Sequence, residues 1–433
     1  MDDDVLEERR SGVTPSSLAT LIYTSGTTGQ PRGCMLTHGN FMHELAAAVE
    51  ELDALFAGDD ASTLLFLPLA HVFARVIQVG AVRQRVLLGY SPDIRRLTAD
   101  LESFRPTFLL AVPRVFEKLF NSASQKAAAD GRGRLFDRAA VTAIAYSRAL
   151  DGGRPGRVLR SRHAFFERLV YARLRAALGG RCLYAVSGGA PLGERLGHFY
   201  RGIGVTVLEG YGLTETTAAV TVNVPDALKI GTVGRPLGGT TVQVAEDGEL
   251  LVRGGQVQSG YWPDGASDDA SVVDGWLRTG DLGEIDDEGF VRVTGRKKEI
   301  LVTAGGKNVA PAGLEDQVRS HPLVSQCLVV GDGQPFIAAL VTLDPDSLRP
   351  WAEAHAKSPA VRDLVDDPDL RGEVQSAVDE ANRSVSQAEA IRRFTVLPVD
   401  WTEESGLLTP SLKLKRTLVM QQFRHEVAAL YDT

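Results

Sequence analysis

The sequence predicts an α/β protein with parallel sheet layers, a small β-barrel subdomain and a smaller α+β domain at the C-terminus. Its first half alternates short apolar runs with helical periodicity, which is typical of a parallel sheet covered by helices. Residues 229–294 hold short strands and Gly turns, the pattern of a small barrel or meander. Residues 297–433 carry an α/β pattern of their own. Among these 433 residues we expect a large domain at 1–296 and a second domain at 297–433.

Apolar runs rich in strand-forming residues mark the strands of the large domain. The first, at residues 18–24, is followed by helical spacing from residue 37 to about 56 and by a second run at 64–67. Strand, helix and strand in this order predict a parallel sheet. The alternation continues with strands at 108–112 and 183–186, long helices between about 114 and 178, and a helix after a Gly-Gly turn.

The C-terminal domain has fewer elements, and the same criteria locate them. We expect strands near 299–302, 326–331 and 336–343, helices near 311–320 and 347–389, and a charged tail. No internal repeat or low-complexity segment interrupts either domain.

Composition excludes several classes of protein. With 24% charged and 44% hydrophobic residues the chain is neither disordered nor fibrous. The net charge of −8 gives no overall basic field for nucleic acid or an anionic membrane, so we expect no nucleic-acid partner. The spacing of Cys34, Cys182 and Cys327 fits neither a disulfide framework nor a metal site, and the acidic N-terminus is unlike a signal peptide. We therefore expect a cytoplasmic protein with reduced thiols.

A loop suited to phosphate follows the first strand. The segment TSGTTGQPRG at 24–33 offers backbone N–H groups freed by glycine, several hydroxyls and one positive charge. It lacks the G-x-x-x-x-G-K-[ST] pattern of a Walker loop. The candidate phosphate ligands are Thr24, Ser25, Gly26, Thr27, Thr28, Gly29 and Arg32.

This loop, followed by LTHGN, resembles the phosphate loop of adenylate-forming enzymes, the superfamily of acyl-CoA synthetases, adenylation domains and luciferases. Further segments resemble the family's motifs in the family's order: LPLAHVFAR (67–75), VPRVFEK (112–118), SGGAPL (187–192), EGYGLTE (209–215), VGRPL (233–237), TGD (279–281), GRKKEILVTAGGKNVAP (295–311) and LTPSLKLKR (408–416). Four of them, LPLAHVFAR, VPRVFEK, GGKNVAP and LTPSLKLKR, look most like bacterial long-chain fatty acyl-CoA synthetases. The resemblance covers nearly the whole chain.

The resemblance implies a two-step reaction. A fatty-acid carboxylate attacks the α-phosphorus of ATP, pyrophosphate leaves, and the thiol of coenzyme A then displaces AMP from the acyl-adenylate. ATP, Mg²⁺, coenzyme A and a long-chain fatty acid are therefore the implied cofactors and partners. Because charge develops on phosphoryl oxygens, cations and N–H donors should dominate the site.

The resemblance also implies roles for individual residues. Lys413 neutralises the α-phosphate and carboxylate, His71 orients the carboxylate, and Glu215 with the Thr24 hydroxyl holds Mg²⁺. Beyond the loop, the implied ATP and AMP contacts are Gly189, Gly210, Tyr211, Thr214, Asp281, Arg296 and Lys298. Ser187, Gly188 and Gly189 would lie against the acyl group, and Gly305, Gly306 and Lys307 would line the coenzyme A channel. The mobile C-terminal domain would turn near Lys297-Lys298 to exchange the Lys413 loop for the loop at 303–311.

Some positions depart from the family's pattern. Arg32 stands where lysine is common, Val302 is apolar where some relatives have lysine, and Arg75 is not the Trp of one long-chain subclass. Only about 17 residues precede the first strand, so we expect the chain to lack roughly 150 N-terminal residues of the family, a whole subdomain of the large domain, and to expose apolar sheet faces. A truncated chain, a misplaced gene start and a split enzyme all fit this start.

Two other functions stay open at this stage. One is a fatty acyl-AMP ligase that delivers its product to a carrier protein, against which GGKNVAP argues mildly because it resembles the loop on the coenzyme A side. The other is a non-catalytic nucleotide- or acyl-binding remnant, which would bind ATP without turnover. Peripheral membrane contact for substrate delivery and a homodimer are further expectations.

Overall fold

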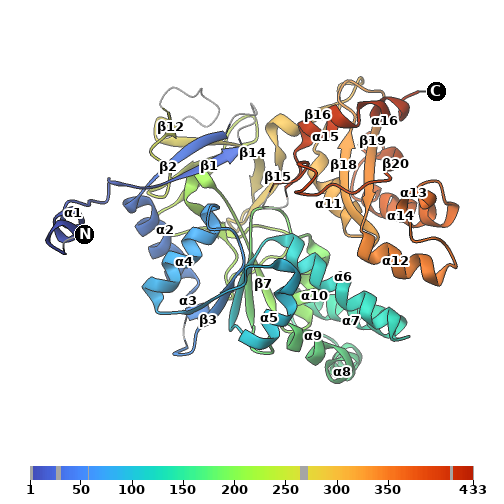
Figure 1. Cartoon of the computed structure of the whole chain (residues 1–433), viewed down its shortest axis with the longest axis horizontal. Helices are drawn as coiled ribbons and strands as arrows, with labels where there is room; N and C mark the ends of the chain where they lie inside the picture. Colours follow the sequence, from blue (N-terminus) through green and yellow to red (C-terminus); the bar gives the residue numbers. More distant parts are fainter. Residues whose placement is uncertain (1–2, 26–30, 57, 264–271, 410–412, 433) are drawn as a thin grey trace. The chain divides into compact units, whose positions relative to one another are not determined.

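The computed structural model describes residues 3–25, 31–56, 58–263, 272–409 and 413–432. Contacts between Cα atoms divide the chain into two compact units, Met1–Pro113 with Ala143–Val293 and Arg114–Thr142 with Thr294–Thr433 (Figure 1). The second unit thus includes residues 114–142, which the sequence analysis assigned to the large domain. None of the helices among the described residues is long and apolar enough to cross a membrane.

The main sheet of the first unit has five strands in chain order. They are β5 (Phe108–Ala111), β6 (Tyr184–Ser187), β7 (Thr206–Leu213), β8 (Ala218–Val222) and β9 (Arg235–Pro236). β5, β6 and β7 are parallel, with Ser187 opposite Glu209. β8 is antiparallel to β7, and β9 is antiparallel to β8. A parallel pair, β3 (Ser62–Leu65) and β4 (Leu87–Tyr90), continues the layer because the Thr107 N–H donates to the Ser62 carbonyl oxygen at 2.9 Å. The predicted parallel sheet is confirmed for these strands.

Helices cover this sheet with small and branched apolar side chains. Phe108, Val186 and Leu208 of the three parallel strands share one buried cluster with Ala47 and Ala81, so α2 (His38–Glu51) and α4 (Val72–Gln84) lie on one face (Figure 1). The other helices of the unit are α1 (Asp3–Ser11), α3 (Asp53–Phe56), α5 (Leu97–Phe104), the end of α7 (Gly133–Asp151), α8 (Arg157–Phe166), α9 (Ala172–Ala177) and α10 (Glu194–Gly202). The helical region predicted at 114–178 is therefore broken, chiefly where Gly152, Gly153 and Pro155 end α7.

The strand predicted at 18–24 exists, but its place in the parallel sheet was wrong. β1 (Leu18–Ser25) pairs antiparallel with β2 (Pro31–Thr37), which in turn pairs with β12 (Tyr261–Trp262). Five residues separate β1 from β2, enough for an antiparallel connection and too few for a parallel crossover. The strand at β2 was missed because Pro31 and Gly33 suggested a loop.

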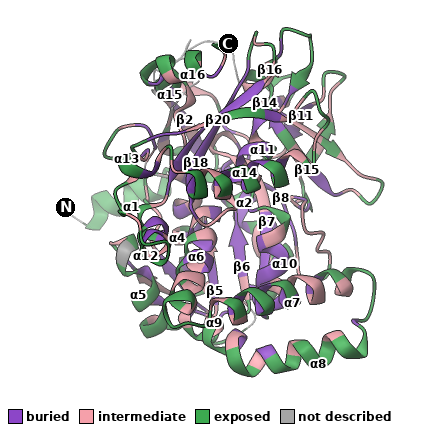
Figure 2. Cartoon of the chain, turned by 90° about the vertical axis from the view of Figure 1, so that its right-hand side faces the viewer, coloured by how far each residue is buried: buried purple, intermediate pink, exposed green. Residues whose placement is uncertain are grey.

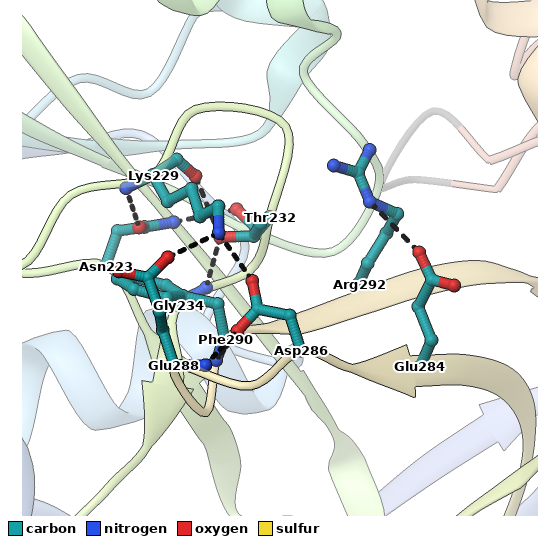
Figure 3. Close-up of polar contacts among 9 residues, drawn as sticks. All are labelled: Asn223, Lys229, Thr232, Gly234, Glu284, Asp286, Glu288, Phe290 and Arg292. Carbon is teal, nitrogen blue, oxygen red and sulfur yellow. Dashed lines mark hydrogen bonds and ion pairs between the residues drawn. The ribbon is translucent and has the colours of Figure 1, made fainter. Parts of the chain in front are cut away.

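The β-rich segment of the first unit, for which the short strands and Gly turns predict a small barrel or meander, forms an antiparallel sheet. It contains β10 (Thr241–Val244), β11 (Glu249–Arg253), β13 (Val272–Val273), β14 (Trp276–Ile285) and β15 (Val291–Arg296). Figure 3 shows how the turn after β14 is fastened: Lys229 Nζ lies 2.7 Å from both Asp286 Oδ2 and Glu288 Oε2. The Asn223 amide donates to the Thr232 carbonyl oxygen at 2.7 Å and so shapes the loop that carries Lys229.

The second unit is built on a three-stranded sheet. β18 (Val324–Val330) and β19 (Ile337–Leu343) are antiparallel, and β20 (Ile391–Val396) is parallel to β19. Its other elements are α6 (Pro113–Ala129), β16 (Leu301–Val302), β17 (Asn308–Val309), α11 (Pro311–Arg319), α12 (Pro345–Ala354), α13 (Val361–Leu364), α14 (Pro368–Asn382), α15 (Arg416–Gln422) and α16 (Arg424–Ala429).

The expected strands and first helix of this unit are confirmed, and the helical region expected near 347–389 consists of the separate helices α12, α13 and α14. Pro368 begins a new helix there, and the Asp367 carboxylate caps it by accepting the Leu370 N–H at 3.1 Å. The segment expected to be a charged tail holds β20 and two short helices.

Candidate active site

The motif EGYGLTE occupies the end of β7 and the turn after it. A Cβ on Gly212 would lie 1.6 Å from the Ala218 carbonyl oxygen, so the tight β7–β8 pairing requires glycine there. The neighbouring Tyr211 hydroxyl donates to Oδ2 of buried Asp281 on β14 at 2.8 Å. Two predicted nucleotide ligands from separate sheets, 70 residues apart, are thereby brought into contact.

Glu215 lies in the short 3₁₀ helix Thr214–Thr216 that follows β7. The Tyr261 hydroxyl of β12 donates to its Oε1 at 2.7 Å, and the Cys34 thiol of β2 donates to the Thr214 carbonyl oxygen at 3.5 Å. Burial raises the pKa of Tyr261, and the Glu215 charge raises it further, so this hydroxyl stays protonated as a donor. These contacts fasten the predicted metal residue to the β1–β2–β12 sheet.

The two described ends of the predicted phosphate loop belong to strands β1 and β2 of this sheet. Thr24 and Arg32 are paired residues of β1 and β2, and the Arg32 guanidinium lies 5.8 Å from the centroid of the Tyr261 ring. Tyr261 therefore contacts both Arg32, through its ring, and Glu215, through its hydroxyl. Gly26, Thr27, Thr28 and Gly29 and the side chain of Ser25 lie outside the described residues.

The motif SGGAPL begins at Ser187, the last residue of β6, and its serine hydroxyl is an unsatisfied donor within the part of the chain that the structure describes. The Ser187 hydroxyl is buried and has no hydrogen-bond partner among the described residues. A Cβ on Gly188 would be 3.5 Å from the Gly210 carbonyl oxygen, and Gly189 has φ +87°, so the chain turns closely past β7. Glu209, opposite Ser187, braces this turn by accepting the Leu192 N–H at 2.8 Å. Such a hydroxyl is available to a ligand.

His71 caps a helix. Its Nδ1 accepts the Phe73 N–H at 3.4 Å at the start of α4, which fixes the position of the imidazole ring. One turn later the buried Nε of Arg75 has no hydrogen-bond partner among the described residues.

The second unit holds the remaining predicted residues. Arg296 ends β15, and Lys298 lies in the 3₁₀ helix Lys297–Glu299. Gly305 and Gly306 lie between β16 and β17, where Gly306 has φ +77°, and Lys307 Nζ is 3.3 Å from Glu389 Oε1.

Lys413 lies at the start of the last described stretch, and its side chain is exposed. Its N–H donates to Thr409 Oγ1 at 3.0 Å, and its carbonyl oxygen accepts the Thr409 N–H at 2.9 Å. This exchange anchors the base of the loop that presents the lysine.

The donor set suits a hard cation shared with a ligand. No group of three or more His, Cys, Asp or Glu side chains gathers for a metal within the described ranges. Magnesium commonly takes one or two carboxylates and completes its shell with water and substrate phosphates. Glu215 and the Thr24 hydroxyl supply oxygens of that kind.

Sequence reasoning missed Tyr261, Glu209 and Asn223. Glu209 is a buried charge within an apolar strand, a signal that was available. Asn223 donates to the Glu209 carbonyl oxygen at 3.3 Å. Nothing in the sequence around Tyr261 distinguishes it from a core aromatic residue.

Comparison with known proteins gives consistent results. The AMP-binding enzyme family matches residues 2–262, and the AMP-binding enzyme C-terminal domain matches residues 298–433. The long-chain-fatty-acid–CoA ligases FadD15 of Mycobacterium bovis and Mycobacterium tuberculosis are each 52% identical over all of this chain and 72% of their own length. The putative fatty-acid–CoA ligase fadD11 of M. tuberculosis is 35% identical over 97% of this chain and 74% of its own.

Solved structures share the fold. The adenylation domain of a carboxylate reductase from Mycobacterium chelonae has a TM-score of 0.69 at 25% identity, covering 96% of this chain and 60% of that one. O-succinylbenzoate coenzyme A synthetase from Bacillus subtilis, in complex with ATP and magnesium, has a TM-score of 0.64 at 22% identity over 94% and 70%. The resemblance drawn from the motifs is confirmed, and the chain belongs to the AMP-binding enzyme family of adenylate-forming proteins.

Proposed function

We propose that this protein is an AMP-forming ligase that activates a long-chain fatty acid with ATP and transfers it to coenzyme A. Identity of 52% over the whole chain to two ligases of that name supports the reaction. The observation that carries the proposal is the hydrogen bond of 2.8 Å between Tyr211 and Asp281, because it joins the EGYGLTE and TGD motifs in one site. A tyrosine ring for adenine stacking and a carboxylate for the ribose hydroxyls thus lie together.

The first unit would bind the nucleotide and hold the carboxylate for attack. Arg32 and the loop N–H groups take the phosphates, and Glu215 with Thr24 would hold Mg²⁺, which withdraws charge from phosphoryl oxygens when bound. The Ser187 hydroxyl, which is buried and has no hydrogen-bond partner in the described part of the chain, donates to the acyl-adenylate beside the close turn at Gly188. His71 orients the fatty-acid carboxylate. In this step a carboxylate oxygen bonds to the α-phosphorus and the bond to pyrophosphate breaks.

The second unit would act in both half-reactions. Lys413 provides positive charge as the carboxylate meets the α-phosphate, with Arg296 and Lys298 near the nucleotide. The β16–β17 connection with Gly305, Gly306 and Lys307 then lines the route by which the coenzyme A thiol reaches the acyl carbonyl and AMP leaves. The proposed boundary between domains 1–296 and 297–433 is the point about which the C-terminal domain would turn between the two half-reactions.

The test is pyrophosphate release from Mg-ATP by the full chain with fatty acids from C8 to C18, with and without coenzyme A. We expect release that depends on the fatty acid, and acyl-CoA only when coenzyme A is present. Lys413→Ala should slow adenylation by about 10²–10³, the usual effect of losing one such cation, and slow thioester formation much less. Lys415→Ala is the matched control. An equal loss in both variants would remove the assigned role of Lys413.

Two other outcomes would replace the proposal. Acyl-adenylate that accumulates with coenzyme A present and is consumed only by a carrier protein would identify an acyl-AMP ligase. ATP binding without pyrophosphate release would identify a binding remnant. A cytoplasmic location and a homodimer remain predictions.

A further inference from the structure

One segment of the first unit carries a charge opposite to that of the chain. Residues 154–181 contain eight arginines and one glutamate, a net charge of +7, so the other 405 residues carry −15 of the total of −8. The overall charge, which argues against an anionic surface as partner, conceals this separation. The segment comprises α8, the π-helical turn Glu167–Tyr171 and α9.

The inner side of the segment is firmly held. Phe166 and Tyr171 are buried, and the His163 ring stacks on Tyr146 with centroids 3.8 Å apart. His163 Nε2 is 2.7 Å from the Gly202 carbonyl oxygen. The single acidic residue, Glu167, is paired with Arg175, which also holds its pKa below the usual range.

The outer side presents large apolar groups to solvent. Val158, Phe165 and Leu169 are 75%, 55% and 40% exposed. Their spacing of seven and four residues places them along one side of a helix. Figure 2 draws α8 largely as exposed. Because the inner contacts fix the helix, these side chains cannot turn inward.

Arginines surround these apolar groups. Arg154, Arg157, Arg160, Arg162, Arg168 and Arg173 are all exposed. None of the six forms an ion pair with a carboxylate in the described part of the chain. Six unpaired cations around a row of apolar side chains make an amphipathic surface that is basic on its polar side.

We propose that this surface, residues 154–173, docks onto an anionic lipid bilayer. Val158, Phe165 and Leu169 would enter between the head groups while the arginines contact lipid phosphates. A nucleic acid would use the cations but leave the exposed aliphatic side chains without a partner, and therefore fits less well. The proposal goes beyond the ligase activity and does not depend on it.

The test is co-sedimentation of the full chain with vesicles of phosphatidylcholine containing about 30% phosphatidylglycerol, and with pure phosphatidylcholine. We expect binding to the anionic vesicles only, weakened by salt. Each basic residue near an anionic surface contributes about fivefold to partitioning, so a triple variant should bind about 100-fold more weakly. That variant is Arg157→Gln, Arg160→Gln and Arg162→Gln.

Two further variants separate charge from insertion. Val158→Ser with Phe165→Ser keeps every charge and should also weaken vesicle binding. The matched control removes the same charge from exposed arginines of the second unit and should bind like the unchanged protein: Arg362→Gln, Arg392→Gln and Arg424→Gln.

Circular dichroism and gel filtration confirm that each variant is folded. Absence of binding to anionic vesicles, or equal binding of all variants, would overturn the proposal. So would tight binding of a 30-nucleotide RNA that is unaffected by Val158→Ser with Phe165→Ser, when vesicles are not bound. Loss of vesicle binding with both α8 variants, and not with the control, supports the proposal whether or not the protein ligates fatty acids.

Discussion

Removing one hydroxyl tests the proposed metal residue. In Tyr261→Phe the ring stays between Arg32 and Glu215 and only the donor to Glu215 Oε1, at 2.7 Å, is lost. A hydrogen bond to a charged group contributes about 1.5–3 kcal/mol. Fixing a freed glutamate side chain costs up to about 2 kcal/mol of rotamer entropy. Since Glu215 is only half-buried, we take the low end of the hydrogen-bond range and no entropy cost, which gives about 1.5 kcal/mol, or roughly tenfold.

The assay is ATP–pyrophosphate exchange dependent on fatty acid, titrated with Mg²⁺. We expect Tyr261→Phe to raise the Mg²⁺ concentration for half-maximal exchange about tenfold with little change in thermal stability. Tyr90→Phe is the matched control, because Tyr90 is 57% exposed and its hydroxyl accepts a hydrogen bond from Gln78 at 3.2 Å.

A double-mutant cycle decides the interpretation. If Tyr261 acts through Glu215, adding Tyr261→Phe to Glu215→Gln should produce almost no further loss. Additive losses in a folded double variant would show that the hydroxyl acts elsewhere. An unchanged Mg²⁺ dependence in Tyr261→Phe would refute the reasoning, together with the role given to the contact.

Other parts of the structure give further expectations. Burial raises the pKa of Glu44, whose Oε2 has no hydrogen-bond partner among the described residues, so the residue increasingly opposes folding as the pH rises above about 4.5. The unfolding free energy of Glu44→Gln should therefore exceed that of the unchanged protein by a margin that grows by up to about 1.4 kcal/mol per pH unit. A constant difference in urea titrations from pH 5 to 8 would contradict this. Gly212→Ala should destabilise by about 3 kcal/mol because its Cβ meets backbone at 1.6 Å, whereas Gly372→Ala in α14 has open space and should be neutral or stabilising in the same urea assay. Burial raises the pKa of the thiols of Cys34, Cys182 and Cys327, so a thiol reagent at pH 8 should modify almost no cysteine until denaturant is added. Rapid modification of the native protein would show that the thiols are not buried.

The strands that the sequence located best are those buried along most of their length. The runs at 108–112 and 183–186 match β5 and β6 to within a residue or two, because a strand covered on both sides must be apolar throughout. β20 was missed because Arg392 and Arg393 are exposed between buried Ile391 and Phe394, which breaks both the continuous and the alternating pattern.

The candidate site shows the same limit. Motifs named Tyr211, Asp281 and Glu215 one at a time, but their partners depend on how distant strands meet. The Tyr261–Glu215 bond spans 46 residues and follows from the pairing of β12 with β2, which no local pattern specifies. Charge separation at α8 was present in the sequence but was hidden when charge was summed over the whole chain.

The division of the chain into interleaved units affects how it folds during synthesis. The path leaves the first unit after Pro113 and returns to it at Ala143, so α6 and the start of α7 belong to the second unit. There Arg114 donates to Ser325 at 3.4 Å, a residue made some 200 positions later. At about 5–20 residues per second, these helices wait roughly 10–40 s for that partner. Ending the gene after the first domain would remove this partner, so a chain of residues 1–296 alone should be prone to aggregation, with residues 114–142 as the exposed segment.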